Sequence, residues 1–348
     1  MMDRREFIQT TIGMVGLTAI LGEGTVTAKE HDLMTVEGPI LSDRIGVALP
    51  HEHILADFIG ADKASRDRYD PDEVFRIVLP HLQRARDVGI ATLFECTPAY
   101  LGRDIGLLKR LAAATGLHIV TNTGYYGAAN DKFLPAHAFT ETADQLAERW
   151  IGEWRDGIEG AGVRPGFIKT GVDPGTLSEV DRKLVRAAAR THLATGLTIA
   201  SHTGDGKAVL EELTVLAEEG VDGTAFIWVH AQAEPNAALR AKAAERGAWI
   251  EFDGIAPQTV DHHVKLVCEM KDRGLLRRVL VSHDAGWYHV GEPAGGVFRP
   301  FDTLVTQFIP ALKKSGLTDE DIEQLTVKNP REAFAVRVRR REEATQGS

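Results

Sequence analysis

Short apolar runs alternate with longer helical stretches along most of the chain. These runs stay apolar for four or five residues and then turn polar, which is typical of strands buried on both faces of a parallel sheet. Eight such runs predict eight strands, at residues 45–53, 91–97, 118–124, 166–172, 198–204, 225–231, 249–254 and 279–285.

Apolar residues at helical spacing fill several gaps between these strands. They predict helices at residues 74–88, 182–195, 207–219 and 235–244, the last beginning at Pro235 and stopped by Gly247. Eight strand–helix units predict an α/β fold of the (β/α)8 TIM-barrel type. An open doubly wound sheet is the alternative, but no glycine-rich phosphate fingerprint follows the first strand.

The chain divides into three segments. Residues 1–28 carry Arg4-Arg5, then an apolar stretch, then the small residues Val26-Thr27-Ala28, an order that resembles a twin-arginine export signal. We therefore expect the Tat translocase as a partner during export and a periplasmic or secreted location; an ordinary N-terminal helix with a chance Arg-Arg pair is the alternative. Residues 36–335 form the barrel domain, and residues 336–348 form a charged tail that we expect to be frayed.

Charge and cysteine content exclude some functions. The chain has 40 Lys and Arg residues against 50 Asp and Glu residues, a formal net charge of −10. An acidic surface argues against nucleic acid or anionic lipid as the main partner. Cys96 and Cys268 form no Cys-x-x-Cys motif, which excludes a cysteine-based zinc site. We expect two buried free thiols, with a single disulfide as the alternative.

Six residues with metal-binding or reactive side chains stand at the ends of five predicted strands. The C-terminal ends of barrel strands meet on one face, so we expect these side chains to converge there. They are His51 and His53 on the first strand, Lys169 on the fourth, His202 on the fifth, His230 on the sixth and Asp284 on the eighth.

The histidines suit metal ligands. His51 and His53 lie two residues apart, and on a strand this spacing directs both imidazoles to the same face. Glu52 points the other way and is interpreted as structural. A hydrogen-bonded core pair is the alternative for the first two histidines. His202 and His230 end neighbouring strands, which favours ligands over isolated core residues.

Lys169 and Asp284 need partners if they are buried. A carboxylate such as Asp284 is costly to bury without a cation or hydrogen bonds. Lysine holds its proton to a pH of about 10.4, and an ammonium cannot bind metal. Lys169 therefore belongs with the histidines only if carbon dioxide has converted its amine to a carbamate. The alternatives are a Schiff-base lysine and a structural lysine that reaches solvent.

Taken together, these motifs resemble those of the phosphotriesterase family of the amidohydrolase superfamily. The resemblance covers roughly residues 36–335. It is carried by His-Glu-His, by Ile-Lys at the fourth strand, by the single histidines and the aspartate, by Leu-Gly-Arg-Asp at residues 101–104 and by Leu-Thr-Val-Lys-Asn-Pro-Arg-Glu-Ala-Phe at residues 325–334.

The resemblance implies a binuclear metal centre at the C-terminal ends of the strands. It assigns His51, His53 and Asp284 to a more buried divalent ion, and His202 and His230 to a more exposed one. N6-carboxylated Lys169 and a hydroxide would bridge the two ions. Zinc fits these ligands best, with cobalt, manganese or iron as alternatives.

The implied activity is hydrolysis of an ester bond in a small molecule, a lactone, carboxylic ester or phosphotriester. The bridging hydroxide would attack the substrate. Carboxylated Lys169 would bridge the two ions beside this hydroxide, and Asp284 would accept the proton of the hydroxide. A homodimer is one candidate for the oligomeric state. Two functions from other classes stay open: a Schiff-base lyase centred on Lys169, and a non-catalytic periplasmic protein that binds metal or solute.

The chain departs from the family at the positions that would carry a proton away from the centre. Ala233 and Gly254 replace an aspartate and a histidine or arginine found in relatives. Asp253 either orients the substrate or braces its strand end. Weaker candidates for lining the substrate pocket are Tyr100, Arg103, Tyr125, Tyr126, Trp287 and Tyr288.

Overall fold

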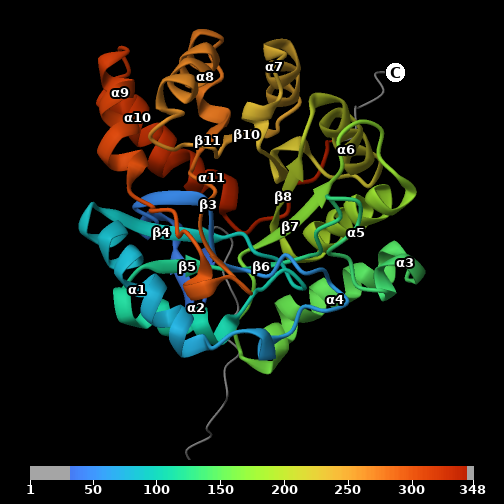
Figure 1. Ribbon diagram of the computed structural model, residues 1–348. Helices are drawn as coiled ribbons and strands as arrows, with labels where there is room; N and C mark the ends of the chain where they lie inside the picture. The colour runs from blue at the N-terminus through green and yellow to red at the C-terminus, as the bar shows by residue number, and fades with distance from the viewer. Residues whose placement is uncertain (1–31, 343–348) are drawn as a thin grey trace, which may run out of the picture.

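The computed structural model describes residues 32–342 and confirms the (β/α)8 barrel (Figure 1). The chain continues through the barrel in strand order, and neighbouring strands pair in parallel. The barrel strands are β3 (Val47–Ala56), β4 (Ile90–Glu95), β5 (His118–Val120) continued by β6 (Asn122–Thr123), β7 (Phe167–Val172), β8 (Thr198–Thr203), β9 (Phe226–Val229), β10 (Trp249–Phe252) and β11 (Val279–Val281).

The ring closes where the last strand meets the first. Strand β12 (Ala285–His289) follows β11 and pairs in parallel with β3, with Ala285 opposite Glu52. The buried Glu52 carboxylate accepts hydrogen bonds from Ser282 Oγ at 2.8 Å, from the His283 ring and backbone at 2.7 and 3.0 Å, and from Ala285 N at 2.9 Å. Glu52 is therefore a structural clamp across the closing seam.

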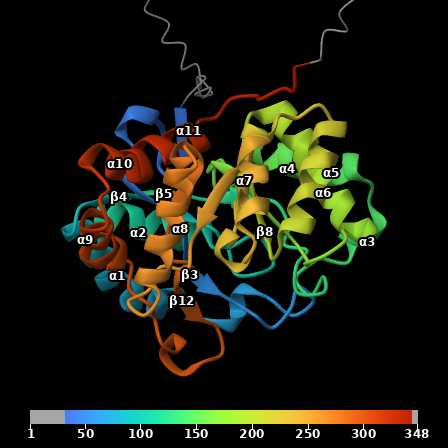
Figure 2. The same ribbon diagram turned by 90° about the horizontal axis from the view of Figure 1, so that it is seen from above.

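The helices cover the outside of the barrel (Figures 1 and 2). Their starts are set by side-chain caps: Ser178 and Thr142 each form a reciprocal capping box, and Asp70, Asp104 and Asp205 each accept a backbone N–H. The helices are α1 (Pro71–Asp87), α2 (Ile105–Thr115), α3 (His137–Thr140), α4 (Ala143–Asp156), α5 (Glu179–Thr195), α6 (Gly206–Glu218), α7 (Ala237–Glu245), α8 (Val260–Asp272), α9 (Ile309–Lys314), α10 (Asp319–Glu323) and α11 (Asn329–Phe334). The four helices expected from apolar spacing match α1, α5, α6 and α7 within three residues at each end.

An antiparallel hairpin precedes the barrel and was not expected. Strands β1 (Asp32–Thr35) and β2 (Gly38–Leu41) have four residues each, too few to show a clear alternation of apolar and polar positions. The hairpin packs against the N-terminal ends of the barrel strands, where Val36 N donates to Ile119 O at 2.9 Å. Its role is to cover the barrel face opposite the candidate site.

The C-terminal segment is ordered as far as the structure describes it, so the expectation of a frayed tail is wrong for residues 336–341. Arg337 N donates to Gly196 O, Asp222 N donates to Arg339 O, and Arg341 N donates to Gly220 O, all at 3.0 Å. These bonds hold the segment against the N-terminal face of the barrel, at the top of Figure 2.

The expected export signal at residues 1–28 lies outside the described residues. Among residues 32–342, none of the helices combines the length and the apolar character needed to cross a bilayer. Cys96 and Cys268 are free thiols, as expected, but only Cys96 is buried; Cys268 is partly exposed.

Replacing Glu52 with glutamine should destabilise the fold by about 2–4 kcal/mol, because an amide nitrogen would then face buried donors. Chemical denaturation measures this loss. Glu148 is exposed on α4, so Glu148→Gln serves as the matched control and should change the free energy of unfolding by less than about 0.5 kcal/mol. Equal stability of the two variants would contradict the clamp role of Glu52.

Candidate metal centre

The six side chains expected at the strand ends line one cavity of about 110 Å³. It lies at the C-terminal ends of the strands, the face toward the bottom of Figure 2. The remaining wall is mostly apolar and aromatic. The cavity is lined by His51, His53, Phe58, Cys96, Pro98, Leu101, Tyr126, Phe133, Lys169, His202, His230, Asp284 and Trp287.

Three potential ligand atoms converge on one side of β3. The Nε2 atoms of His51 and His53 lie 3.2 Å apart, and Asp284 Oδ1 lies 3.1 Å from His53 Nε2 and 3.7 Å from His51 Nε2. Ligands about 2.1 Å from a tetrahedral cation are about 3.4 Å from one another. Asp284 Oδ1 is buried and has no hydrogen-bond partner among the described residues. The three atoms therefore fit a shared divalent cation.

The His53 ring is fixed in the tautomer that a metal ligand needs. Thr97 Oγ1 donates its proton to Leu55 O at 3.1 Å, so it must accept at its 2.8 Å contact with His53 Nδ1. His53 therefore carries its proton on Nδ1 and directs the Nε2 lone pair into the cavity. Burial lowers the pKa of His53 to about 4, which keeps the ring neutral.

Asp253 holds two histidines at once. Its carboxylate accepts from His51 Nδ1 at 3.0 Å and from His230 Nδ1 at 2.7 Å, and also from His230 N at 3.0 Å and Gln232 Nε2 at 2.6 Å. The residue is 0% exposed. Burial alone would raise the pKa of Asp253, but His230 and His51 hold it well below its usual range.

Asp253 is therefore a supporting residue and not a substrate-binding one. A cation shared by His51, His230 and Asp253 is also conceivable, because their side-chain atoms cluster within 4.8 Å. We reject it because Asp253 binds the Nδ1 side of both rings, which leaves both Nε2 atoms for the cavity. Glu251 supports the same His51 Nδ1 from 3.3 Å.

His202 and His230 form the second candidate pair. Their rings are T-shaped with centroids 4.4 Å apart. Burial lowers the pKa of His202 well below its usual value, so this ring is neutral. His230 and Asp284 have φ angles of 67° and 50°, left-handed values that are unfavourable for residues with a side chain. Such strain costs roughly 1–3 kcal/mol per residue and is concentrated at functional sites.

Lys169 lies on β7 with only 2% of its surface exposed. Its Nζ makes a long contact of 3.4 Å with Thr170 O, and the Tyr126 ring centroid is 5.5 Å away. Within residues 32–342 it forms no ion pair, so the amine does not serve as a structural cation. Burial lowers the pKa of Lys169, which favours the neutral amine that can add carbon dioxide.

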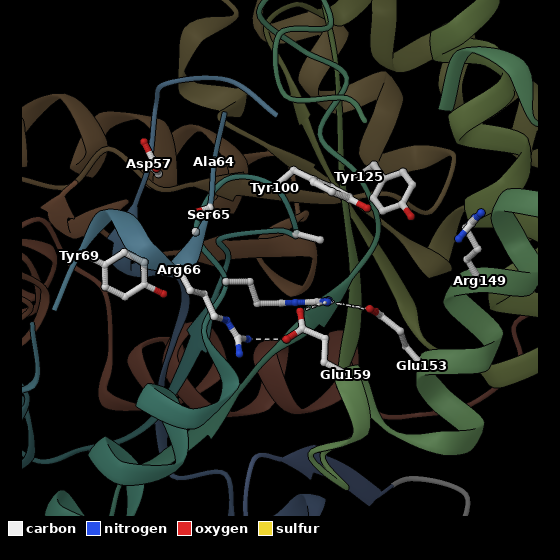
Figure 3. Close-up of a pocket in the computed structure, with 13 residues that line it drawn as sticks. Asp57, Ala64, Ser65, Arg66, Tyr69, Tyr100, Tyr125, Arg149, Glu153 and Glu159 are labelled. Atoms are coloured by element: carbon white, nitrogen blue, oxygen red, sulfur yellow. Dashed lines mark hydrogen bonds and ion pairs between the residues drawn. The ribbon is translucent and has the colours of Figure 1, made fainter. Parts of the chain in front are cut away.

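The softer pocket candidates divide between two cavities. Tyr126 and Trp287 line the candidate metal centre, and Trp287 stacks on His53 with ring centroids 3.8 Å apart. Tyr100, Tyr125 and Arg103 line a neighbouring cavity of about 480 Å³ (Figure 3). Tyr288 is buried and contributes to neither wall.

Arg103 does not offer a free guanidinium. It forms hydrogen bonds with Asn122 O at 2.7 Å and with both oxygens of Glu153 at 3.0 and 2.6 Å. It therefore braces β6 against α4.

Gly254 leaves room for a histidine from another element. A Cβ atom at this position would lie 3.2 Å from His263 Nε2 and 3.1 Å from Gln232 Nε2. His263 is buried on α8 and donates from Nδ1 to Thr259 O at 2.9 Å, which leaves Nε2 without a partner among the described residues. The space that a larger side chain at position 254 would need is thus occupied by His263 and Gln232.

Sequence reasoning missed the residues that support the ligands. Thr97 and Gln232 were not identified. For Asp253 the sequence did not distinguish between orienting the substrate and bracing the strand end. The only sequence signal for Thr97 and Asp253 was a polar residue at the end of a strand. This signal does not indicate which side chain the residue binds. Phe58 and Phe133 were also missed, because single aromatic residues in loops have no distinguishing pattern.

Comparisons with known proteins agree on one family. The phosphotriesterase family model matches residues 31–334. A phosphotriesterase homology protein of Escherichia coli is 29% identical over 296 residues, which cover 84% of this chain and 99% of that protein. An aryldialkylphosphatase of Saccharolobus solfataricus is 28% identical over 308 residues, covering 85% and 97%. A solved structure of an organophosphate-hydrolysing protein engineered from a weak promiscuous lactonase superposes with a TM-score of 0.78 at 25% identity, covering 87% and 99%.

Replacing Asp253 with asparagine should weaken metal binding roughly 10- to 100-fold, because its amide could no longer accept from two imidazoles at once. Competition with a fluorescent chelator measures the metal dissociation constant. Glu251→Gln is the matched control, since Glu251 contacts one histidine only and at a longer distance. An unchanged dissociation constant in Asp253→Asn would show that the carboxylate does not orient the ligands.

Proposed function

The chain belongs to the phosphotriesterase family, and from this premise we propose that it is a metal-dependent hydrolase that cleaves the ester bond of an uncharged small molecule. The observation that carries the proposal is the convergence of the His51 and His53 Nε2 atoms, the rings of His202 and His230, the Asp284 carboxylate and the Lys169 amine on one small cavity. We favour a lactone or carboxylic ester as the natural substrate, with a phosphotriester as the second candidate.

The donor set fits two divalent cations. His51, His53 and Asp284 would hold one, His202 and His230 would hold the other, and Lys169 in its carboxylated form would serve both. Imidazole and carboxylate ligands suit zinc, with cobalt, manganese or iron as alternatives. When bound, the pair supplies a hydroxide nucleophile near neutral pH and polarises the C=O or P=O bond of the substrate.

The cavity wall supports an uncharged substrate. Phe58, Phe133, Leu101 and Trp287 present apolar surface beside the histidines. Lys169 is the single basic side chain in the wall apart from the histidines, and carboxylation would make it an anion. Apart from the proposed metal ions, the wall would therefore offer an anionic substrate no cationic side chain, whereas a neutral ester would lose little hydration on entering.

Asp284 is the candidate proton acceptor. Burial alone would raise its pKa, but contacts with His53 and His51 hold the pKa below its usual value, so the carboxylate is ionised at neutral pH. Its Oδ1 atom faces the cavity without a hydrogen-bond partner among the described residues. It can therefore accept a proton at the point where an attacking water would lose one.

The aryldialkylphosphatase among the relatives keeps the phosphotriester candidate open, and the lactonase template among the solved structures supports the lactone. The test is a panel of lactones, aryl esters and phosphotriesters, assayed on protein with measured metal content before and after chelation. Turnover that is lost with the metal and restored on reloading supports the proposal. Absence of turnover on the whole panel by fully loaded protein would favour a binding protein.

Lys169→Ala should lose metal and reduce activity by more than the roughly 100-fold expected for a supporting residue, because a shared anionic ligand disappears. Short carboxylic acids should restore part of the activity by occupying the space of the carbamate. Lys207→Ala on the exposed face of α6 is the control and should behave like the unmodified chain. A Schiff-base lyase would instead be trapped by borohydride with its substrate and would not respond to carboxylic acids.

We propose separately that residues 1–28 direct export through the twin-arginine route. Changing Arg4 and Arg5 together to lysine should leave the precursor in the cytoplasm, because the pair is the defining feature of that signal. Cell fractionation and immunoblotting measure the distribution. Undiminished export of the double variant would argue against this route.

A further inference from the structure

A second large cavity opens at the opposite end of the barrel from the candidate metal centre. It measures about 710 Å³ and lies between the end of α7, the start of β10, the loop before β11 and the start of α11. Strand β10 begins here at Trp249 and ends next to Asp253, so the two sites are separated by roughly 13 Å of strand. The cavity is lined by Ala244, Trp249, Gly274, Leu275, Arg277, Arg278, Gln324, Lys328, Asn329, Arg331 and Glu332.

The wall of this cavity is strongly basic although the chain as a whole is acidic. Four of its side chains are cationic and one is anionic. The single anion, Glu332, already pairs with Arg337, and Lys328 pairs with Glu323 at 2.9 Å. Within residues 32–342 the other three cations, Arg277, Arg278 and Arg331, form no ion pair. They are therefore available to an anion from solution.

Some arginines elsewhere on this surface form ion pairs with neighbouring carboxylates. On the opposite flank of the molecule, Arg186 pairs with Glu218 and Glu219, and Arg190 pairs with Asp144 and Glu219. The abundance of carboxylates in the chain makes such pairing easy to achieve. The three guanidinium groups around this cavity have no such ion pair within residues 32–342, and they lie close together around one concavity.

The cavity is also held in shape. Asn329 Nδ2 donates to Leu276 O at 2.8 Å and to Val279 O at 2.6 Å, which ties α11 to the loop before β11. The Arg278 guanidinium lies over the Trp249 ring, 5.0 Å from its centroid, and the indole N–H donates to Thr224 O at 3.1 Å. The cation on Arg278 is therefore positioned by a buried ring.

A further arginine lies beneath the cavity. Arg339 is buried under α11 and donates to the carbonyls of Glu332, Ala333 and Ala335. Burial lowers the pKa of Arg339 to about 10, and Arg337 and Arg278 add to the decrease. Several arginines are thus close enough to influence one another at this end of the barrel, although Glu332 and Asp222 offset part of their charge.

We propose that this basic cavity is a binding site for a small phosphorylated anion, separate from the metal centre. A guanidinium fork matches phosphate oxygens in pairs, and three forks around one cavity suit a multivalent group. The volume lies within the range of small-molecule sites. A nucleic acid would require a basic stripe along the surface rather than a concavity in an acidic protein.

Titration of metal-loaded protein with inorganic phosphate and with glycerol 3-phosphate, followed by 31P NMR, tests the proposal. We expect saturable binding, and at least a tenfold higher dissociation constant in the double variant Arg277→Gln with Arg331→Gln. Arg76→Gln, an exposed α1 arginine outside the cavity, should bind as the unmodified chain does. Citrate should bind more weakly than phosphate, since its carboxylates carry less charge per group.

The ester-hydrolysis rate separates this site from the metal centre. The double variant should keep kcat/KM unchanged, because no substituted residue contacts the catalytic cavity. Retained phosphate affinity in the double variant would assign the binding to the metal centre and overturn the proposal. Absence of saturable binding would also overturn it, as would binding only to phosphatidylglycerol vesicles and not to free phosphate. Arg331→Lys, which keeps the charge but not the fork, should give an intermediate affinity and excludes misfolding as the cause.

Discussion

The candidate centre depends on one buried carboxylate that binds two imidazoles from different strands. Asp253, just after β10, accepts hydrogen bonds from the Nδ1 atoms of His51 and His230. It thereby fixes the orientation of two rings that are 179 residues apart in the sequence (230 − 51). A single anion in this position sets both tautomers and leaves both Nε2 lone pairs for the cavity. Asp253 stays ionised because the two rings donate hydrogen bonds to it. The carboxylate therefore depends on the histidines for its charge, and the histidines depend on the carboxylate for their orientation.

The sequence predicted the frame of this arrangement because strand ends carry a simple signal. Histidine, lysine and aspartate residues that close apolar runs were expected at the mouth of the barrel, and six such positions were identified in this way. The supporting contacts were not predictable, because Thr97 and Asp253 act through partners on other strands. Hydrogen bonds across the barrel depend on register and ring orientation, which residue spacing does not specify. The β1–β2 hairpin was missed for a different reason, since four-residue strands give too little alternation to detect.

Average charge proved a poor guide to local charge. The formal net charge of −10 argued against anionic partners, yet the chain gathers Arg277, Arg278 and Arg331 around one cavity. These residues are distant from one another in sequence except for one adjacent pair, so no basic run marks them. The C-terminal segment adds Arg337 and Arg339 only because its backbone bonds hold it against the same face. Tertiary structure, and not composition, creates the positive surface.

Burial links the fold to its proposed chemistry at Lys169. A barrel strand buried on both faces gives its side chain little access to water, and this makes an ammonium ion unfavourable at that point. The same desolvation leaves the amine unprotonated more often, which is the form that reacts with carbon dioxide. Addition of carbon dioxide to this neutral amine, with release of one proton, would give an anion beside four imidazoles. Lys169 is difficult to explain as part of the hydrophobic core. Its carboxylation would give the cavity a second anionic ligand beside Asp284, which suits the binding of two cations.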